Sequence, residues 1–187
     1  IQVSKGASSV KNGYESISGQ INIEYLKPQA TDGFRANAYL DTDLKQEVNL
    51  DGSIHLNDRL STGTLLHFEN RQTEHDGNGD SFMDMPKLRQ YNLMHRWAYV
   101  SPGWISQLSL RILRDERNGG QSAKHSSGMT EPLYTTSVET NRYELQWKNG
   151  FTLDADHNTS IALMMHGSWH DAWNIFGNTH YDVTQKN

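Results

Sequence analysis

The stretch that decides the fold is IQVSKGASSVKNGYESISGQINIEYL, residues 1–26. Two segments of β type, residues 1–5 and 20–26, enclose a loop that is rich in glycine and serine. The second segment alternates apolar and polar side chains, which is the period of a strand with two different faces. We expect a positive φ, or a close approach of another backbone segment, at three glycines: Gly6, Gly13 and Gly19.

This stretch resembles the end of the plug domain of TonB-dependent outer-membrane transporters. The family pattern is roughly V-x-K-G-x-x-S-x-x-x-G-x-x-x-x-x-G-x-I-N-I, and the run GYESISGQINIEYLKP is most similar to a Bacteroidetes-type branch. The resemblance implies that residues 1–30 are the C-terminal part of a plug domain and residues 31–187 the N-terminal part of an outer-membrane β-barrel. The residues that match the motif are Lys5, Gly6, Gly13, Gly19 and Asn22.

The same resemblance implies a function and a location. Such proteins import a scarce extracellular ligand, for example a siderophore or other metal complex, cobalamin or a glycan, and they are not enzymes. The implied location is the outer membrane of a Gram-negative bacterium. The implied partners are membrane lipid, the small ligand, a surface lipoprotein and the TonB energy-transducing complex, which pulls on a segment upstream of Ile1. Because barrels of this family have 22 strands, we expect this chain to hold only the first part of one.

Composition excludes several other classes. The chain of 187 residues has 22 acidic and 17 basic side chains and a net charge of -5, so it offers no basic surface for nucleic acid. Its mean hydropathy is -0.77, and no apolar run approaches the roughly 20 residues of a membrane-spanning helix. Low mean hydropathy is compatible with a transmembrane barrel, whose apolar residues occupy every second position. The lack of cysteine rules out disulfides and thiolate metal sites.

Alternation continues along the chain and predicts an all-β, antiparallel fold. It is clearest at residues 47–56, where Val48, Leu50 and Ile54 share one face and charged or polar residues occupy the other. Segments near ten residues suit a tilted membrane crossing better than the usual strands of globular sheets. We therefore expect about seven strands of a transmembrane barrel, at residues 34–41, 47–56, 60–70, 90–100, 104–114, 142–148 and 161–169.

The connections and the aromatic residues support the same interpretation. Compact connections near residues 57, 102 and 149–158 alternate with long polar ones at residues 71–88, 115–137 and from 171 onward. Short periplasmic turns and long extracellular loops are typical of outer-membrane barrels. Aromatic belts are expected at both membrane interfaces. The inner belt is predicted at Trp97, Tyr99, Trp104, Trp147 and Phe151, and the outer belt at Phe68, Tyr143 and Trp169.

A soluble or surface-attached β-rich binding or adhesion module is the main alternative. The inner faces of a water-soluble β-sandwich also alternate, and its core also contains tryptophan. An outer-membrane barrel hydrolase is a more distant alternative, because serine, histidine and aspartate occur without any supporting arrangement. The transporter and the soluble module differ in what their apolar faces touch.

One predicted outer loop has the spacing of a calcium site. Residues 76–84, DGNGDSFMD, place oxygen ligands at every second position, which resembles the start of a calcium-binding loop. Ser81 stands where such loops carry glycine, and Lys87 stands where they carry a bidentate glutamate. A solvated loop rich in turns has the same composition. The candidate Ca²⁺ ligands are the side-chain oxygens of Asp76, Asn78, Asp80 and Asp84 and the backbone carbonyl of Phe82.

Histidine and methionine provide a second candidate site. The chain has nine histidines, and Met164 and His166 share one face of a predicted strand. If that face lines a lumen, the pair could contact a passing ligand, including a soft metal or metal complex. A structural role is the favoured alternative, since polar lumen residues bond the plug or water and methionines fill gaps.

Overall fold

A computed structural model describes residues 2–6, 19–25, 27–30, 32–122, 132–154, 156 and 159–187. No helix among these residues is long and apolar enough to cross a membrane. The regular structure of the described residues consists of ten strands: β1 (Gln2–Lys5), β2 (Gly19–Asn22), β3 (Gly33–Leu40), β4 (Gln46–His55), β5 (Leu60–Arg71), β6 (Lys87–Ser101), β7 (Trp104–Gly120), β8 (Thr135–Asp154), β9 (Thr159–Phe176) and β10 (Thr179–Lys186).

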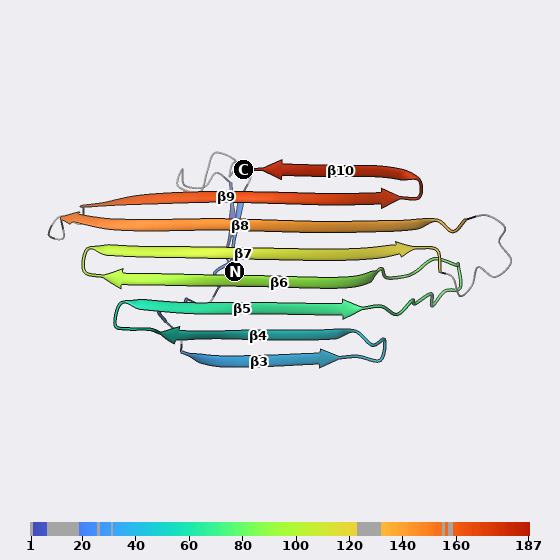
Figure 1. Cartoon of the computed structure of the whole chain (residues 1–187), viewed down its shortest axis with the longest axis horizontal. Helices are drawn as coiled ribbons and strands as arrows, with labels where there is room; N and C mark the ends of the chain where they lie inside the picture. The colour runs from blue at the N-terminus through green and yellow to red at the C-terminus, as the bar shows by residue number, and fades with distance from the viewer. Residues whose placement is uncertain are drawn as a thin grey trace.

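The strands form two antiparallel sheets. Strands β1 and β2 pair only with each other, and β3 to β10 form one sheet in which every strand pairs with its neighbours in sequence (Figure 1). The predicted all-β class is confirmed, with eight strands in the large sheet where the sequence predicted about seven. The large sheet does not close on itself: β3 and β10 are its two edges.

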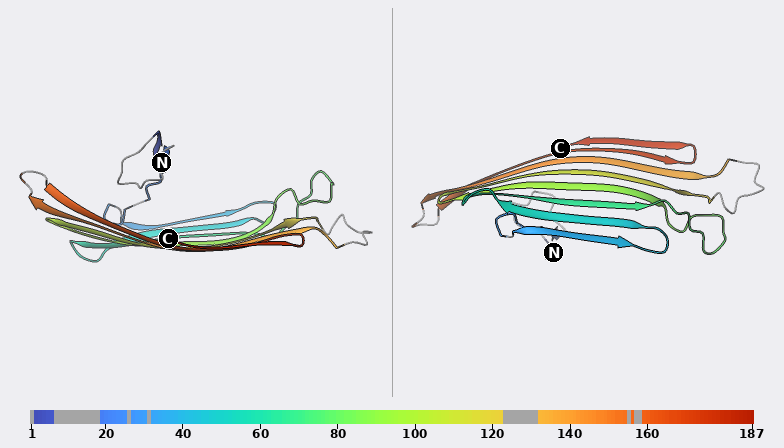
Figure 2. Two further views of the ribbon diagram at one scale, coloured as in Figure 1. Left: turned by 90° about the horizontal axis from the view of Figure 1, so that it is seen from above. Right: turned by 60° about the horizontal axis from the view of Figure 1, so that its bottom comes forward.

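The large sheet is a single curved layer. Figure 2 shows that it is bowed and that the β1–β2 hairpin lies on its concave side. Among the described residues, the buried apolar side chains are few: Pro28, Leu88 and Ala98. A soluble domain of this length would bury many more in a core between two layers. The described residues therefore contain no conventional hydrophobic core.

The alternation of the sequence becomes two chemically different faces. Strand register sets Leu50 opposite Leu66, Leu66 opposite Leu93, and Leu93 opposite Ile112, so that apolar side chains form rows across the convex face. The residues between them point to the other face, which is polar and carries the hairpin. Because the side-chain period of a strand is two, the register fixes all these positions together.

Three strands extend well beyond their predicted ends. β7 continues to Gly120, β8 runs from Thr135 to Asp154, and β9 continues to Phe176. The added part of β7 and the added start of β8 are mainly polar on both faces, so hydropathy alternation could not detect them. Ladder hydrogen bonds and cross-strand ion pairs hold them instead, such as Arg114 with Glu139 at 3.2 Å.

The two ends of the sheet differ as predicted, with one exception. The compact turns that follow β4 and β6 lie at the left of Figure 1, and the long connections that follow β5 and β7 leave the sheet at the right, where the short turn between β3 and β4 also lies. The prediction of a long polar connection from Asp171 onward was wrong. β9 continues through this region and turns tightly into β10 at Gly177 and Asn178, with Gly177 at a φ of 58°.

Candidate functional site

The convex face has the dimensions of a membrane-crossing surface. In β8, Tyr143 and Phe151 bound a segment of nine residues, and Leu145 and Trp147 lie between them on the same face. Transmembrane strands need about 9–11 residues to cross the hydrocarbon layer. The aromatic ends align across strands, since Trp104 pairs with Phe151 in register.

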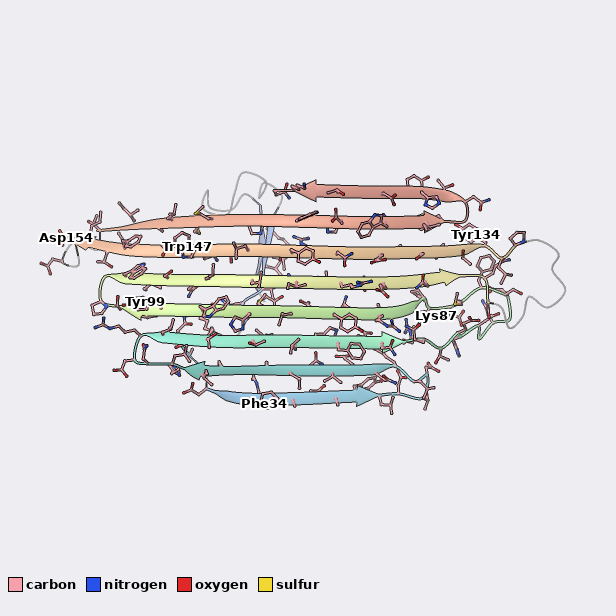
Figure 3. The ribbon with its side chains drawn as sticks, in the orientation of Figure 1. Phe34, Lys87, Tyr99, Tyr134, Trp147 and Asp154 are labelled. Atoms are coloured by element: carbon pink, nitrogen blue, oxygen red, sulfur yellow. The ribbon has the colours of Figure 1, made fainter. Side chains whose placement is uncertain are left out.

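Aromatic side chains gather at the end with the compact turns. The rings of Trp104 and Phe151 are stacked, with centroids 6.1 Å apart and planes 7° apart, and Tyr99 lies 4.8 Å from Trp104. The indole Nε1 of Trp147 donates a hydrogen bond to the hydroxyl of Ser106 at 3.1 Å. Figure 3 labels Tyr99 and Trp147 at this end of the sheet. Rings with a polar tip suit the boundary between hydrocarbon and water.

The apolar side chains between the aromatic ends are exposed in this chain. Leu145 is 51% exposed and Leu163 is 49% exposed, although both lie within long strands. Exposed apolar patches of this extent mark surfaces that contact a membrane or another protein. Closer to the long loops, the same face becomes charged: Arg114 contacts Glu116 and Glu139.

The concave face carries charged pairs between β3 and β8. At one side, Arg35 donates hydrogen bonds to Asp51, and the ammonium of Lys45 lies 2.9 Å from a carboxylate oxygen of Glu69. Further along, Glu144 accepts a hydrogen bond of 2.7 Å from Nε of Arg142. Such pairs between polar partners are typical of a face that meets water or another polar surface.

The segment that follows β2 crosses this concave face and encloses a cavity. Residues 23–25 and Lys27, called the linker below, form one wall, and strands β6, β7 and β8 form the floor of a cavity of about 380 Å³. Glu24 of the linker pairs with Lys27, and the hydrogen bond and charge of Lys27 lower the pKa of the Glu24 carboxyl. The charge of Arg96 on β6 lowers that pKa further.

Pro28, the residue that follows the linker, packs against the sheet. Pro28 is buried, and its Cγ lies 3.2 Å from the position that a Cβ would take at Gly63 of β5. The turn is closed by a hydrogen bond from the amide of Ala30 to the carbonyl of Lys27 at 2.9 Å. Asp32, two residues after Ala30, also contacts the sheet: one of its carboxylate oxygens lies 2.5 Å from Nδ1 of His55.

We expect Gly63→Ala to weaken the packing of Pro28 against β5. The new methyl group would lie 3.2 Å from Pro28 Cγ and 3.2 Å from Ser53 Cβ, so one of them must shift. Overpacking of this kind costs about 1–3 kcal/mol, and here the linker can move more easily than the strand. Faster proteolytic cleavage near residue 28 would report the loss. Gly150→Ala is the matched control, because nothing lies within 4 Å of the position of its Cβ, and equal cleavage of both variants would contradict the prediction.

The motif residues at the start of the chain lie in the small hairpin. Lys5 pairs with Gly19, and Asn22 pairs with Gln2 at the other end of the ladder. The φ of Gly6 is 87° and that of Gly19 is 153°, which confirms the predicted need for glycine at both positions. Gly13 lies outside the described residues.

The carboxylates of the predicted calcium loop serve mainly as acceptors for the loop's own backbone. Asp76 accepts hydrogen bonds from the amides of Gly79, Asp80 and Ser81. Asp80 accepts from the amide of Phe82, and Asp84 accepts from the amide of Gly77. Ser81 has a φ of 71°, the left-handed conformation that glycine provides in calcium loops.

No group of three metal-ligating side chains occurs among the described residues. Asn78 donates its amide hydrogen to Asp80, and the ring of Phe82 is exposed. The loop is also attached to the neighbouring one, since Phe82 forms an isolated β-bridge with Gln121 and Ser122 donates a hydrogen bond to Glu74. The contacts within the described part of this loop thus show a loop that is held by its own hydrogen bonds.

The second pair of candidate residues lies on the concave face of β9. His166 is part of the cavity lining, and Met164 lies two residues away on the same face. Neither alternation nor motif spacing in the sequence identified Arg96, Pro28 or Gly63. An isolated glycine inside a strand is a signal of close approach by another backbone or side chain, and it could have identified Gly63.

Comparison with known proteins finds no matching family model, no matching curated protein and no matching solved structure. The arrangement itself therefore carries the functional argument: one apolar face with aromatic ends, and one charged face crossed by a docked linker.

Proposed function

We propose that this chain is the plug-to-barrel junction of a TonB-dependent outer-membrane transporter. Residues 1–30 end the plug domain, and the strands that follow begin the barrel. The observation that supports this most directly is the convex face of a single-layer sheet, which on β8 exposes Leu145 and Trp147 between the aromatic side chains of Tyr143 and Phe151. A layer without a protein partner on its apolar side needs an apolar medium there.

The open edges of the sheet support the same proposal. Unpaired backbone amides and carbonyls cannot remain exposed in hydrocarbon, so a membrane sheet must close. In the proposed protein, further strands pair with β3 and β10 and complete the barrel. The charged concave face then lines the lumen, where the plug lies.

In this proposal the two ends of the sheet face different compartments. The end of the sheet with the compact turns after β4 and β6 faces the periplasm, and the end with the long connections after β5 and β7 faces the exterior, where a scarce ligand first binds. The TonB complex pulls on the plug from the periplasm, and the ligand passes along the polar lumen. The docked linker keeps the end of the plug attached to the barrel wall while the rest of the plug rearranges.

Fractionation of cells that produce the full-length protein tests the proposal. We expect the protein in the outer-membrane fraction, retained there after a high-salt and alkaline wash and released only by detergent, because the apolar face is covered by lipid. A protein that stays in solution without detergent would contradict this and would favour a soluble β-rich binding module. A periplasmic soluble protein from the same cells is the control for lysis and washing.

A further inference from the structure

The cavity beneath the linker is positively charged, whereas the whole chain carries a net charge of -5. Its volume of about 380 Å³ is within the usual range of small-molecule sites. Four cationic side chains and two carboxylates line it, which leaves two more positive charges than negative ones. These six residues are Lys27, Arg96, Arg111, Lys148, Glu24 and Glu144.

Both carboxylates are engaged by cations. Glu24 pairs with Lys27 within the linker. Glu144 accepts a hydrogen bond from Arg142 and lies 3.6 Å from Nη1 of Arg111. A carboxylate held between two guanidinium groups has little attraction left for a second cation, because its charge is already compensated. The lining is therefore unsuited to a cationic ligand.

Other polar groups of the lining are hydrogen-bond donors that suit an anion. Lys148 reaches the cavity from β8 and Arg96 from β6, on opposite sides of β7. In the same cross-strand row as Arg96, Ser109 of β7 provides a hydroxyl and Gln146 of β8 an amide, which can donate hydrogen bonds. Guanidinium, ammonium and amide donors converging on one space are the usual partners of carboxylate and phosphate oxygens.

We propose that this cavity binds an oxyanion, a carboxylate or phosphate group carried by the imported ligand. The inference rests on the proposed transport function and gives the ligand a chemical class, that of an anion. The linker forms one wall of the site, so an anion bound there would contact both the barrel wall and the end of the plug. Ligand occupancy and linker position are then coupled.

The test is calorimetric titration of the full-length protein, purified in a nonionic detergent at low salt. The probes are citrate for carboxylate chemistry, inorganic phosphate for phosphate chemistry and glucose as an uncharged control. We expect binding of citrate, phosphate or both, weakened by added sodium chloride because the attraction is electrostatic, and no binding of glucose. The anion that binds with the higher affinity shows whether the site prefers a carboxylate or a phosphate group.

Two variants test the site and one serves as the control. Lys148→Gln and Arg96→Gln each remove a cationic donor, and we expect each to weaken anion binding about tenfold or more. Arg89→Gln removes the same charge from the opposite face of β6 and should leave the affinity unchanged. Lys148 is exposed, so its variant remains informative even if the half-buried Arg96 is needed for folding.

Absence of binding by both anions would overturn the inference, as would equal losses in the Arg89 and Lys148 variants. The titration is separate from the fractionation experiment. A protein that fractionates with the outer membrane but binds neither anion refutes the anion site alone. A protein that is soluble without detergent refutes the transporter, and the same titration still decides whether the cavity takes an anion.

Discussion

We expect Leu145→Arg to lower the free energy of unfolding of the membrane-inserted protein by about 1–3 kcal/mol, because Leu145 lies between the aromatic end at Tyr143 and the middle of the segment, and the cost of an arginine on the lipid face of a barrel rises with depth. Leu145 lies on the convex face of β8, between Tyr143 and Trp147, and is 51% exposed. Because about half of the residue is exposed and no second layer covers it, its replacement removes few contacts. The penalty therefore comes from the surrounding medium.

The matched control is Leu153→Arg. Leu153 belongs to the same strand and is 61% exposed, but it lies beyond Phe151 at the end with the compact turns. A cationic side chain near the interface costs about 0–1 kcal/mol. Denaturant unfolding of the full-length protein in phospholipid vesicles measures both variants. Similar values at the two positions would mean that depth in a bilayer does not govern this face.

The second large effect is expected for Gly120→Ala, at the end of β7. Gly120 has a φ of 107°, which costs an alanine about 1–3 kcal/mol. A Cβ there would also lie 2.3 Å from the carbonyl oxygen of Tyr134 and 2.8 Å from Cα of Thr135. Both are backbone atoms that cannot move aside independently. We therefore expect a loss of about 3 kcal/mol or more in the free energy of unfolding.

Gly79→Ala separates strain from collision in this experiment. Gly79 also has a positive φ, 72°, but nothing lies within 4 Å of the position of its Cβ. It should show only the conformational cost, with the structural effect confined to its loop. Thermal unfolding followed by tryptophan fluorescence compares the two variants. If they lose equal stability, the contact between the end of β7 and the start of β8 does not matter.

The backbone at Gly120 also supports the two long connections that follow β5 and β7. The amide of Gln121 donates a hydrogen bond of 2.8 Å to the carbonyl of Tyr134, and the amide of Met83 donates to the carbonyl of Gly120 at 2.9 Å. Both long connections therefore depend on the backbone path at this glycine. In the proposed transporter, Gly120→Ala should weaken ligand capture at the outer surface as well as stability.

The fold was predictable where one face of a strand is apolar. Val48, Leu50 and Ile54 predicted β4 closely, because alternation with a period of two is typical of a strand with one apolar face. The same signal failed where both faces are mainly polar, at the C-terminal end of β7 and the N-terminal end of β8. There the strands persist because antiparallel neighbours satisfy their backbone hydrogen bonds, a cause that is invisible in the hydropathy of one segment.

For the candidate sites, too, local features could be predicted from the sequence and contacts between distant residues could not. The spacing that predicted calcium ligands at Asp76 and Asp80 does occur in a loop with special backbone geometry, but its carboxylates bond to the loop's own amides. The position of His166 on the polar face could be predicted from the alternation of its strand. Its neighbours in the cavity could not, since Lys27 and Arg96 come from distant parts of the chain.

By itself, the sequence determined that the chain is all-β, that its strands have one apolar and one polar face, and that Gly6 and Gly19 need the conformational freedom of glycine. These properties are local, because they follow from the period of a strand and the φ of single residues. The tertiary structure alone decided that Pro28 packs against Gly63 and that the linker covers a cationic cavity. Such contacts depend on the register of many paired strands, which brings together residues that are far apart in sequence.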